Sequence, residues 1–336
     1  AIESAVRRVA SEQGVPIVDY ADVMAEESAR ITGVAIPGAE LFLDHVHPTI
    51  EGHRLLAVAL IDELVDRGIV DRRIPWTDPA IGRVSAQIRA RIDDEEQARA
   101  LGNLAQVLRW AGKIEDAAAL AERALALADD GADATLTASR ALADVATREG
   151  RFEEALVHIR RALAYRPANT ITHFQYGLMY LNESTRDIER AAAHLFLALT
   201  LDRDRALAHQ TVGLAMAERG QYRLAHRFLT TAARLDPDDL ETRVPLERLE
   251  SILGDRATGV APAQIVVEPG RGPVPAAAGQ VALGPDGSWI RDGIWTEWHE
   301  NGEPRRFLTY DAAGPTGTEV NWTADGDETG RTEHSP

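Results

Sequence analysis

Three segments of the chain, GKIEDAAALAERALAL (112–127), GRFEEALVHIRRALAYRP (150–167) and GQYRLAHRFLTTAARLDP (220–237), can be laid directly over one another. Each contains two alanines seven residues apart, and a fourth such pair lies between the second and third segments. The pairs are Ala117 with Ala124, Ala155 with Ala162, Ala191 with Ala198, and Ala225 with Ala232. A repeat of 34 to 38 residues is typical of stacked helix pairs. Residues 98–239 are therefore predicted to form an α-solenoid of about four helix pairs.

This pattern resembles the tetratricopeptide repeat (TPR) family. Besides the alanine pairs, the matching positions are Leu104, Ala105, Leu142, Pro167, Gly177, Tyr180, Gly213 and Pro237, with Ala143 as the small residue of the second copy. The third copy has about two extra residues near 182–186. Residues 240–254 fit a capping helix that Pro245 interrupts early, so we expect the array to span 98–255.

The resemblance implies a protein or peptide partner in a groove lined by the first helix of each pair. The candidate groove residues are Gln106, Arg109, Trp110, Arg140, Asp144, Arg148, Phe174, Leu178, Gln210 and Leu214. The basic and amide set with which some members clamp a peptide C-terminal carboxylate is not reproduced, so we expect no receptor for chaperone tails. The alternative interpretation is that most of these residues line a solvated groove.

Residues 1–70 have a different pattern, which predicts the incomplete tail of an α/β domain. A helix ends at Gly14, residues 15–19 (VPIVD) are predicted to form a buried strand, and a helix from Ile50 ends at Gly68. One strand cannot form a sheet, so we expect the chain to be the C-terminal part of a longer protein, with any signal or anchor before Ala1. Residues 71–97 are predicted to be a connection with a polar helix.

The segment LFLDHVHPTIEGHRLLA (41–57) contains the strongest candidate for catalysis. Asp44 and His47 lie three residues apart in a turn, where the carboxylate can accept the Nδ1–H of the imidazole and leave Nε2 free to take a proton. Thr49 is predicted to cap the following helix, and Gly52 to allow its close packing. Alternatives are a capped surface turn without chemistry, or a metal site of His45, His47 and His53; we expect no metal and no cofactor.

The segment resembles the last block of SGNH/GDSL-type ester hydrolases. The resemblance implies that Asp44 orients His47 and that His47 is the general base. The serine nucleophile block of that family is missing, because Ser4, Ser11, Ser28, Ser85 and Ser288 lack its Gly-Asp-Ser context. We expect this chain alone to be inactive, and a longer protein to hydrolyse or transfer O-acyl esters, including esters on carbohydrate. The alternative is a non-enzymatic TPR adaptor that retains a hydrolase remnant.

The C-terminal part is predicted to be a small antiparallel β module. Residues 256–286 are rich in Pro and Gly and are predicted to be a linker. GIWTEWHENG (293–302) returns as GTEVNWTADG (317–326), a shift of 24 residues that predicts consecutive hairpins over 287–330. These resemble MORN-like repeats. Four tryptophans are expected to pack within the hairpins, with a sugar-stacking platform as the alternative: Trp289, Trp295, Trp298 and Trp322.

The composition excludes several classes of function. The chain has 336 residues and a net charge of −17, which disfavours binding to nucleic acid or to an anionic membrane. It contains no Cys, which excludes disulfides, zinc–thiolate sites and thiol catalysis in these residues. No run of 18 apolar residues occurs, so we expect no membrane-spanning segment here.

Overall fold

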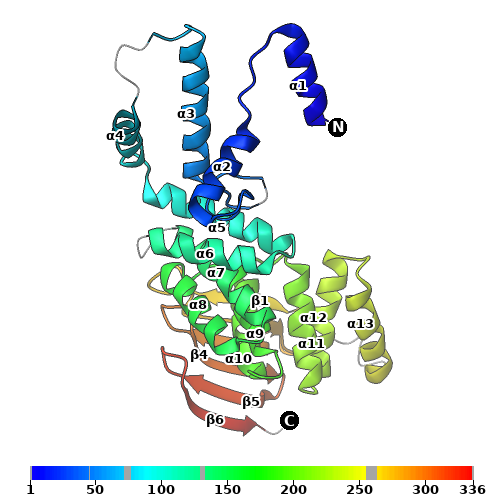
Figure 1. Ribbon diagram of the computed structural model, residues 1–336. Coiled ribbons are helices and arrows are strands. Elements are labelled where there is room, and N and C mark those ends of the chain that lie inside the picture. Colours follow the sequence, from blue (N-terminus) through cyan, green and yellow to red (C-terminus); the bar gives the residue numbers. More distant parts are fainter. Residues whose placement is uncertain (1, 45, 72–76, 129–132, 255–262, 335–336) are drawn as a thin grey trace. The chain divides into compact units, whose positions relative to one another are not determined.

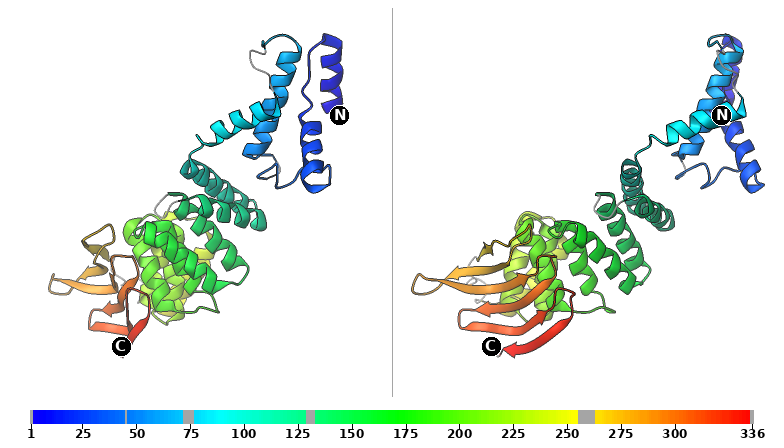
Figure 2. Two further views of the ribbon diagram at one scale, coloured as in Figure 1. Left: turned by 60° about the vertical axis from the view of Figure 1, so that its left-hand side comes forward. Right: turned by 90° about the vertical axis from the view of Figure 1, so that its left-hand side faces the viewer.

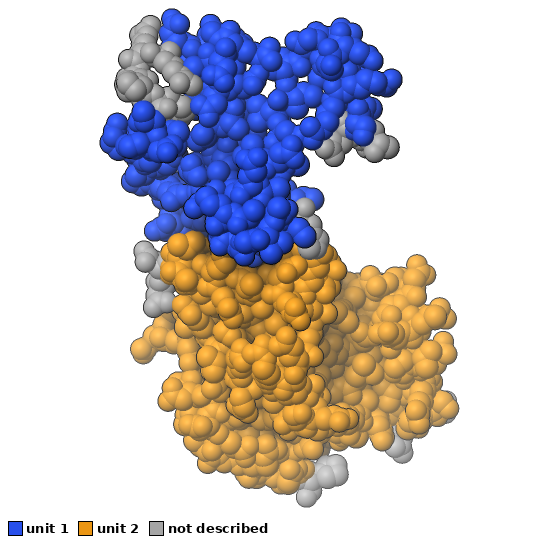
Figure 3. All heavy atoms as spheres, viewed as in Figure 1, with its two compact units in different colours: residues 1–97 blue, residues 98–336 orange. Residues whose placement is uncertain are grey.

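The computed structural model describes residues 2–44, 46–71, 77–128, 133–254 and 263–334 (Figure 1). The chain divides into two compact units, residues 1–97 and residues 98–336 (Figure 3). None of the helices in the described ranges combines the length and the apolar character needed to cross a membrane.

The second unit begins with the predicted helical array. Its helices are α5 (Asp94–Trp110, beginning in the first unit), α6 (Ile114–Leu127), α7 (Asp133–Arg148), α8 (Phe152–Tyr165), α9 (Thr170–Tyr180), α10 (Ile188–Leu201), α11 (Ala206–Glu218), α12 (Tyr222–Leu235) and α13 (Leu240–Leu253). They form the four expected pairs and the capping helix. The interruption predicted at Pro245 is wrong, because α13 continues through it. Burial of Leu249 in the core shared with α12 offsets the hydrogen bond that proline cannot donate.

The small residues of the repeat lie where helices approach most closely. A Cβ atom added to Gly177 of α9 would lie 2.5 Å from Cγ of Leu195 on α10. The equivalent atom on Gly213 of α11 would lie 2.7 Å from Cγ of Leu229 on α12. The alanines of the pairs are almost completely buried. The repeat therefore encodes the separation of the two helices in each pair.

Six antiparallel strands follow, in the order β1–β2–β3–β4–β5–β6 within one sheet. They are β1 (Gln264–Glu268), β2 (Ala277–Leu283), β3 (Trp289–Trp298), β4 (Pro304–Asp311), β5 (Gly314–Trp322) and β6 (Glu328–His334). The prediction of a linker over 256–286 is wrong where β1 and β2 form, and the β module is larger than residues 287–330. Two short apolar runs, QIVV and QVAL, lie within that Pro- and Gly-rich segment, and pairing with β3 buries most of β2.

The 24-residue shift corresponds to two hairpins with the same geometry. Gly302 donates to the carbonyl of His299 at 3.0 Å, and Gly326 donates to the carbonyl of Thr323 at 3.0 Å. The two glycines have φ values of 85° and 87°, a backbone conformation that favours glycine. A register shift precedes the last tryptophan of β3 and of β5. The predicted hairpins are thus confirmed.

Three of the four tryptophans are buried as expected: Trp295, Trp298 and Trp322. The prediction for Trp289 is wrong, because its side chain is 56% exposed. Trp289 pairs with Leu283 of β2, whereas the pairing of β3 with β4 begins only at Gly293. The start of β3 therefore extends beyond β4, which leaves more than half of the Trp289 side chain exposed.

The sheet packs against α10. Figure 2 shows the strands, in orange to red, beside the green helices of the array. Almost the whole of α10 is buried, and Phe196 shares an apolar cluster with Ile294, Phe307 and Val320 of the sheet. Ion pairs add to this contact: Arg227 of α12 lies 2.7 Å from Asp292, and Glu189 of α10 lies 3.2 Å from Arg331 of β6. One core thus joins the helices and the strands of this unit.

A buried polar network crosses the same contact. Tyr176 Oη of α9 donates to Glu303 Oε1 at 2.8 Å, and His194 Nε2 of α10 lies 3.6 Å from Glu303 Oε2. Burial alone would raise the pKa of Glu303, but His194, Tyr176 and the charge of Arg160 outweigh it and lower the pKa. Burial beside His194 also lowers the pKa of His173 to about 3, so His173 is neutral. Glu303 is therefore ionised inside the contact.

The first unit contains α1 (Ile2–Gln13), α2 (Tyr20–Thr32), α3 (Ile50–Asp66) and α4 (Asp78–Arg89). The strand predicted at 15–19 is wrong: the segment is irregular, and Val15 and Ile17 are exposed. A strand needs a hydrogen-bonded neighbour, and the described part of this unit contains only one isolated bridge, between Phe42 and Pro48. The described part of the expected α/β tail is therefore helical and loop structure.

Candidate functional site

The predicted groove residues lie on the first helix of each pair and form one continuous row. We call their surface the groove face, defined by the ten candidate groove residues on α5, α7, α9 and α11. Side-chain contacts link α5 to α7 and α7 to α9: Arg109 to Asp144 at 2.8 Å, and Arg140 to Gln175 at 2.9 Å. Gln210 of α11 continues the row by donating to Asp239, the N-cap of α13, at 3.0 Å. The repeat register thus brings the candidates together.

The candidates differ in what they offer to a ligand. Trp110 is 69% exposed, with the Arg109 guanidinium 5.8 Å from its ring centre. Phe174 and Gln210 are buried, and Gln210 is engaged with Asp239, so their part in the groove is structural. Leu178 is exposed and can contact a partner. Gln106 is half-buried, and Leu214 is exposed like Leu178.

Charged groups concentrate on α5 and α7. Asp144 Oδ2 accepts from Arg109 at 2.8 Å and from Arg148 at 3.1 Å, so two guanidinium groups share one carboxylate. Arg140 donates through Nε to the neutral amide oxygen of Gln175. This end of the groove face therefore carries more positive than negative charge.

Apolar groups concentrate on α9 and α11. Leu178 and Leu214 directly follow the equivalent glycines Gly177 and Gly213, and Ile171 and Leu207 lie seven residues before them. These four aliphatic side chains are between 40% and 52% exposed. Residues seven apart on a helix share a face, and the two pairs occupy equivalent positions in successive repeats. We call these four residues the aliphatic patch.

Sequence reasoning missed three residues of this face. Ile171 and Leu207 were detectable, because they occupy the same place in the third and fourth repeats. Arg205 precedes α11, with its guanidinium carbon 5.3 Å from the ring centre of Phe174. It lies outside the helix, so the helical periodicity carried no signal for it.

The Asp44–His47 pair forms a compact turn in the first unit. His47 Nδ1 lies 2.7 Å from Asp44 Oδ2, and Asp44 Oδ1 accepts the backbone N–H groups of Val46 and His47 at 2.7 Å each. Burial opposes ionisation of Asp44, but these hydrogen bonds outweigh it and lower its pKa to about 2. The imidazole is 61% exposed and the carboxylate 7%. Among the described residues, Nε2 of His47 has no hydrogen-bond partner.

The backbone around this pair is fixed by the following helix. Thr49 caps α3 by accepting the N–H of Gly52 at 3.1 Å. A Cβ atom on Gly52 would lie 2.8 Å from the carbonyl oxygen of Leu41 and 2.9 Å from Cβ of Pro48. The expected cap and close approach are thus present. The roles of Asp44 and His47 in catalysis remain predictions.

The metal alternative involves His45, which lies outside the described residues. Ser28 is the one candidate serine buried in the first unit, and its Oγ lies within hydrogen-bond distance of two acceptors, Glu40 Oε1 at 2.7 Å and the carbonyl oxygen of Ile36 at 2.9 Å. Within the described ranges, no group of three or more His, Cys, Asp or Glu side chains converges as metal ligands would.

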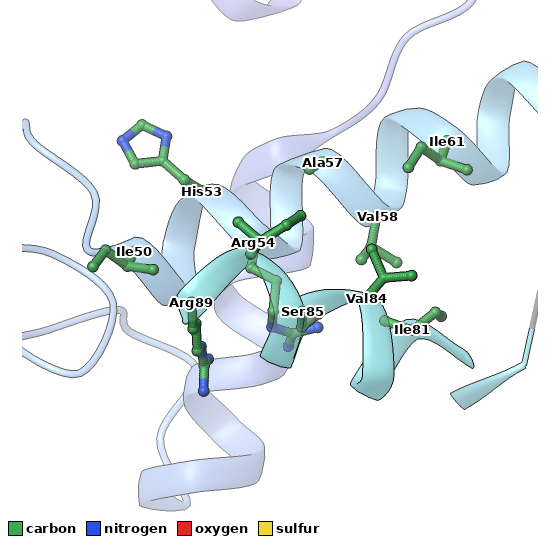
Figure 4. A pocket seen from close by; sticks show the side chains of 11 residues that line it. Ile50, His53, Arg54, Ala57, Val58, Ile61, Ile81, Val84, Ser85 and Arg89 are labelled. Atoms are coloured by element: carbon green, nitrogen blue, oxygen red, sulfur yellow. The ribbon is translucent and has the colours of Figure 1, made fainter. Parts of the chain in front are cut away.

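An apolar cavity of about 290 Å³ lies between α3 and α4 (Figure 4). Aliphatic side chains from both helices line it, including Val58, Ile61, Ile81 and Val84. His53 also lines this cavity, whereas His47 does not. Arg54 and Arg89 also line the cavity, and both pair with Glu51.

Comparisons with known proteins agree with the helical array. The sequence model of the tetratricopeptide repeat family matches residues 96–168. A comparison with curated proteins finds no match. Solved structures similar to this chain include pilF of Pseudomonas aeruginosa, at 23% identity over 49% of this chain and 74% of that one, with a TM-score of 0.43.

Two further similar structures are of TPR proteins with a peptide-binding site or a bound peptide. YrrB, a TPR protein with an unusual peptide-binding site, is 19% identical over 48% of this chain and 80% of its own, with a TM-score of 0.39. The first TPR of Spaghetti (RPAP3), bound to the HSP90 peptide SRMEEVD, is 16% identical over 38% and 98%, with a TM-score of 0.35. Residues 96–168 thus carry tetratricopeptide repeats, and the pairs α9–α10 and α11–α12 continue the same pattern to residue 235.

Proposed function

We propose that this chain is a protein–protein interaction scaffold that binds a peptide segment of its partner on the groove face. The observation that supports this proposal is the aliphatic patch of Ile171, Leu178, Leu207 and Leu214. The chain's own sheet covers α10, yet these side chains on the neighbouring helices α9 and α11 stay exposed. Contiguous exposed aliphatic groups beside charged residues are typical of protein-binding surfaces.

The test uses an array of acetylated and amidated dodecapeptides whose positions vary among Leu, Ala, Ser, Glu and Lys. We expect a subset to bind the full chain, and Leu178→Glu combined with Leu214→Glu to weaken the binding by tenfold or more. Val157→Glu is the matched control, because Val157 is also exposed but lies on α8. Binding that is insensitive to the double substitution, or an array without binders, contradicts the proposal.

A second candidate function rests on the 2.7 Å contact between Asp44 and His47. In this proposal, Asp44 orients the imidazole and His47 acts as the general base of an SGNH-type ester hydrolase whose serine lies outside this chain. The chain alone then shows no hydrolysis of an aryl acetate above background. Activity that disappears in His47→Ala would show that this chain supplies the nucleophile itself. A non-enzymatic adaptor with this pair as a remnant is the alternative.

For the hairpin repeats of β3–β6 we propose a structural role rather than a role in binding. We infer that they form a MORN-like module whose contribution is to hold the array through α10. The support is that Trp298, Trp322 and Phe307 share one core with α10 residues. The sheet then acts as a fixed cover of the array, and the partner contacts lie elsewhere.

A further inference from the structure

Arg140 of α7 is a half-buried cation whose hydrogen-bond acceptor is neutral. Its Nε donates to Gln175 Oε1 at 2.9 Å, and no carboxylate lies within ion-pair distance of its guanidinium among the described residues. Burial and the positive charges of Arg109 and Arg205 lower the pKa of Arg140, and the negative charge of Asp144 only partly opposes them. Arg109 pairs with Asp144, one turn along α7 from Arg140, and Arg205 lies over the ring of Phe174, next to the Gln175 that Arg140 contacts. Three guanidinium groups therefore gather on this part of the groove face. A protein of net charge −17 has here a local excess of positive charge.

The acids nearby do not balance these cations. Asp144 serves both Arg109 and Arg148. Arg205 faces the ring of Phe174, and its Nε is 3.9 Å from Asp202. Two carboxylates thus face four guanidinium groups on this part of the groove face. A carboxylate from a ligand would pair with Arg140, because a charge-assisted hydrogen bond stabilises a half-buried guanidinium more than a neutral acceptor does.

The surroundings of Arg140 show how such a ligand would continue. On the side of α5, which Arg109 links to α7, lies the exposed Trp110. On the other side lie the exposed Leu178 of α9 and Leu214 of α11. Apolar contacts are therefore available on both sides of the charge. A bound peptide that crosses these helices would have its central residues, not its end, beside Arg140. The carboxylate therefore comes from an Asp or Glu side chain within the peptide.

We propose that the groove face recognises an acidic–aliphatic segment, in which an internal Asp or Glu pairs with Arg140 and aliphatic side chains contact the patch of Ile171, Leu178, Leu207 and Leu214. This inference rests on the proposed function and names its ligand chemistry. The charge fixes the register of the segment, and the patch supplies the apolar contact.

The dodecapeptide array tests this inference separately from the proposed function. The expected result is that bound peptides combine Leu with Glu, and that Lys is depleted. For the strongest binder, Glu→Gln in the peptide raises the Kd for the wild-type chain by about tenfold or more. The same peptide exchange has little effect with Arg140→Gln, because the partner charge is already gone. Arg140→Lys retains part of the discrimination.

The controls distinguish the two failures. Arg223→Gln on the exposed side of α12 should bind as the wild type does, and Arg205→Gln provides a second test if Arg140→Gln does not fold. An array without binders contradicts the proposed function itself. Binders that contain Leu but no acid, or that lose nothing in Arg140→Gln and Arg205→Gln, overturn only the acidic–aliphatic inference.

Discussion

Two carboxylates of this chain, Asp44 and Glu303, are largely buried among donors that keep them ionised. Asp44 accepts two backbone N–H groups and the imidazole of His47, and Glu303 faces Tyr176 and His194. In both cases burial opposes ionisation, and the surrounding groups outweigh it and lower the pKa. A lowered pKa stabilises the folded chain above the ordinary pKa of the carboxyl, and this contribution is lost as the pH falls.

The first prediction concerns Asp44. Replacing Asp44 with Ala removes the acceptor of the Val46 and His47 amides, so we expect faster hydrogen exchange at these two amides at pH 6. Because the pKa of Asp44 is lowered from 3.8 to about 2, wild-type protection should decline as the pH falls from 3.8 through about 2. Glu12→Ala on the exposed side of α1 is the control and should change neither amide. Unchanged exchange in Asp44→Ala contradicts the described turn.

The second prediction concerns Glu303. Glu303→Ala leaves the Tyr176 hydroxyl without its acceptor and removes the carboxylate 3.6 Å from His194 Nε2. We expect this to lower the free energy of unfolding by about 1–3 kcal/mol in denaturant melts at pH 7. Because the pKa of Glu303 is lowered from its ordinary 4.5, the loss should shrink as the pH falls below that value. Glu300→Ala in the same turn is exposed and should have little effect. Equal stability of the two variants would show that the network contributes nothing to the contact.

Helix pairs and strands follow their sequence signals to different degrees. The alanine and glycine spacing predicted the helix pairs correctly, because small residues are required wherever two backbones cross closely. The strands β1 and β2 were missed, since their short apolar runs lie among Pro and Gly residues that indicate a linker. The strand at 15–19 was predicted but does not form, because propensity cannot replace a missing pairing partner. Arg140 was identified from its register, whereas its approach to Arg205 depends on the packing of three helices.

The third prediction tests the close approach of helices. Gly177→Ala and Gly213→Ala place a Cβ against the buried Leu195 and Leu229, so each should destabilise the second unit by about 1–3 kcal/mol. Gly102→Ala on α5 is the matched control: its nearest neighbour would be 3.6 Å away, an ordinary contact, and alanine favours the helix by about 0.5–1 kcal/mol. Thermal melts followed by circular dichroism measure all three. If Gly102→Ala proves as destabilising as Gly177→Ala, helix crossing does not explain the glycines.

At the scale of the whole molecule, the array and the sheet of the second unit share one core. Helix α10 is buried from both sides, and Phe196, Leu195 and Leu199 are completely inaccessible. The first unit has few buried apolar groups of its own, chiefly Met24 and Leu41. The two units should therefore differ strongly in stability.

The fourth prediction follows from the shared core. A fragment of residues 95–256 should be helical and unfold cooperatively, but at a lower temperature than the second unit of the full chain, because α10 loses the cover of the sheet. The fragment should also bind a hydrophobic dye through the uncovered side of α10. A random-coil spectrum would contradict the repeat array. An unchanged melting temperature would contradict the role of the sheet.

Binding of a partner segment on the groove face should be visible in hydrogen–deuterium exchange of the full chain, compared with and without the strongest peptide from the array. We expect slower exchange in α7, α9 and α11 when the peptide is bound, with β1–β6 and α1–α4 unchanged. The protection should be lost when Leu178 and Leu214 are both Glu, because the aliphatic contact is then removed. Protection confined to the sheet or to the first unit would contradict binding on the groove face.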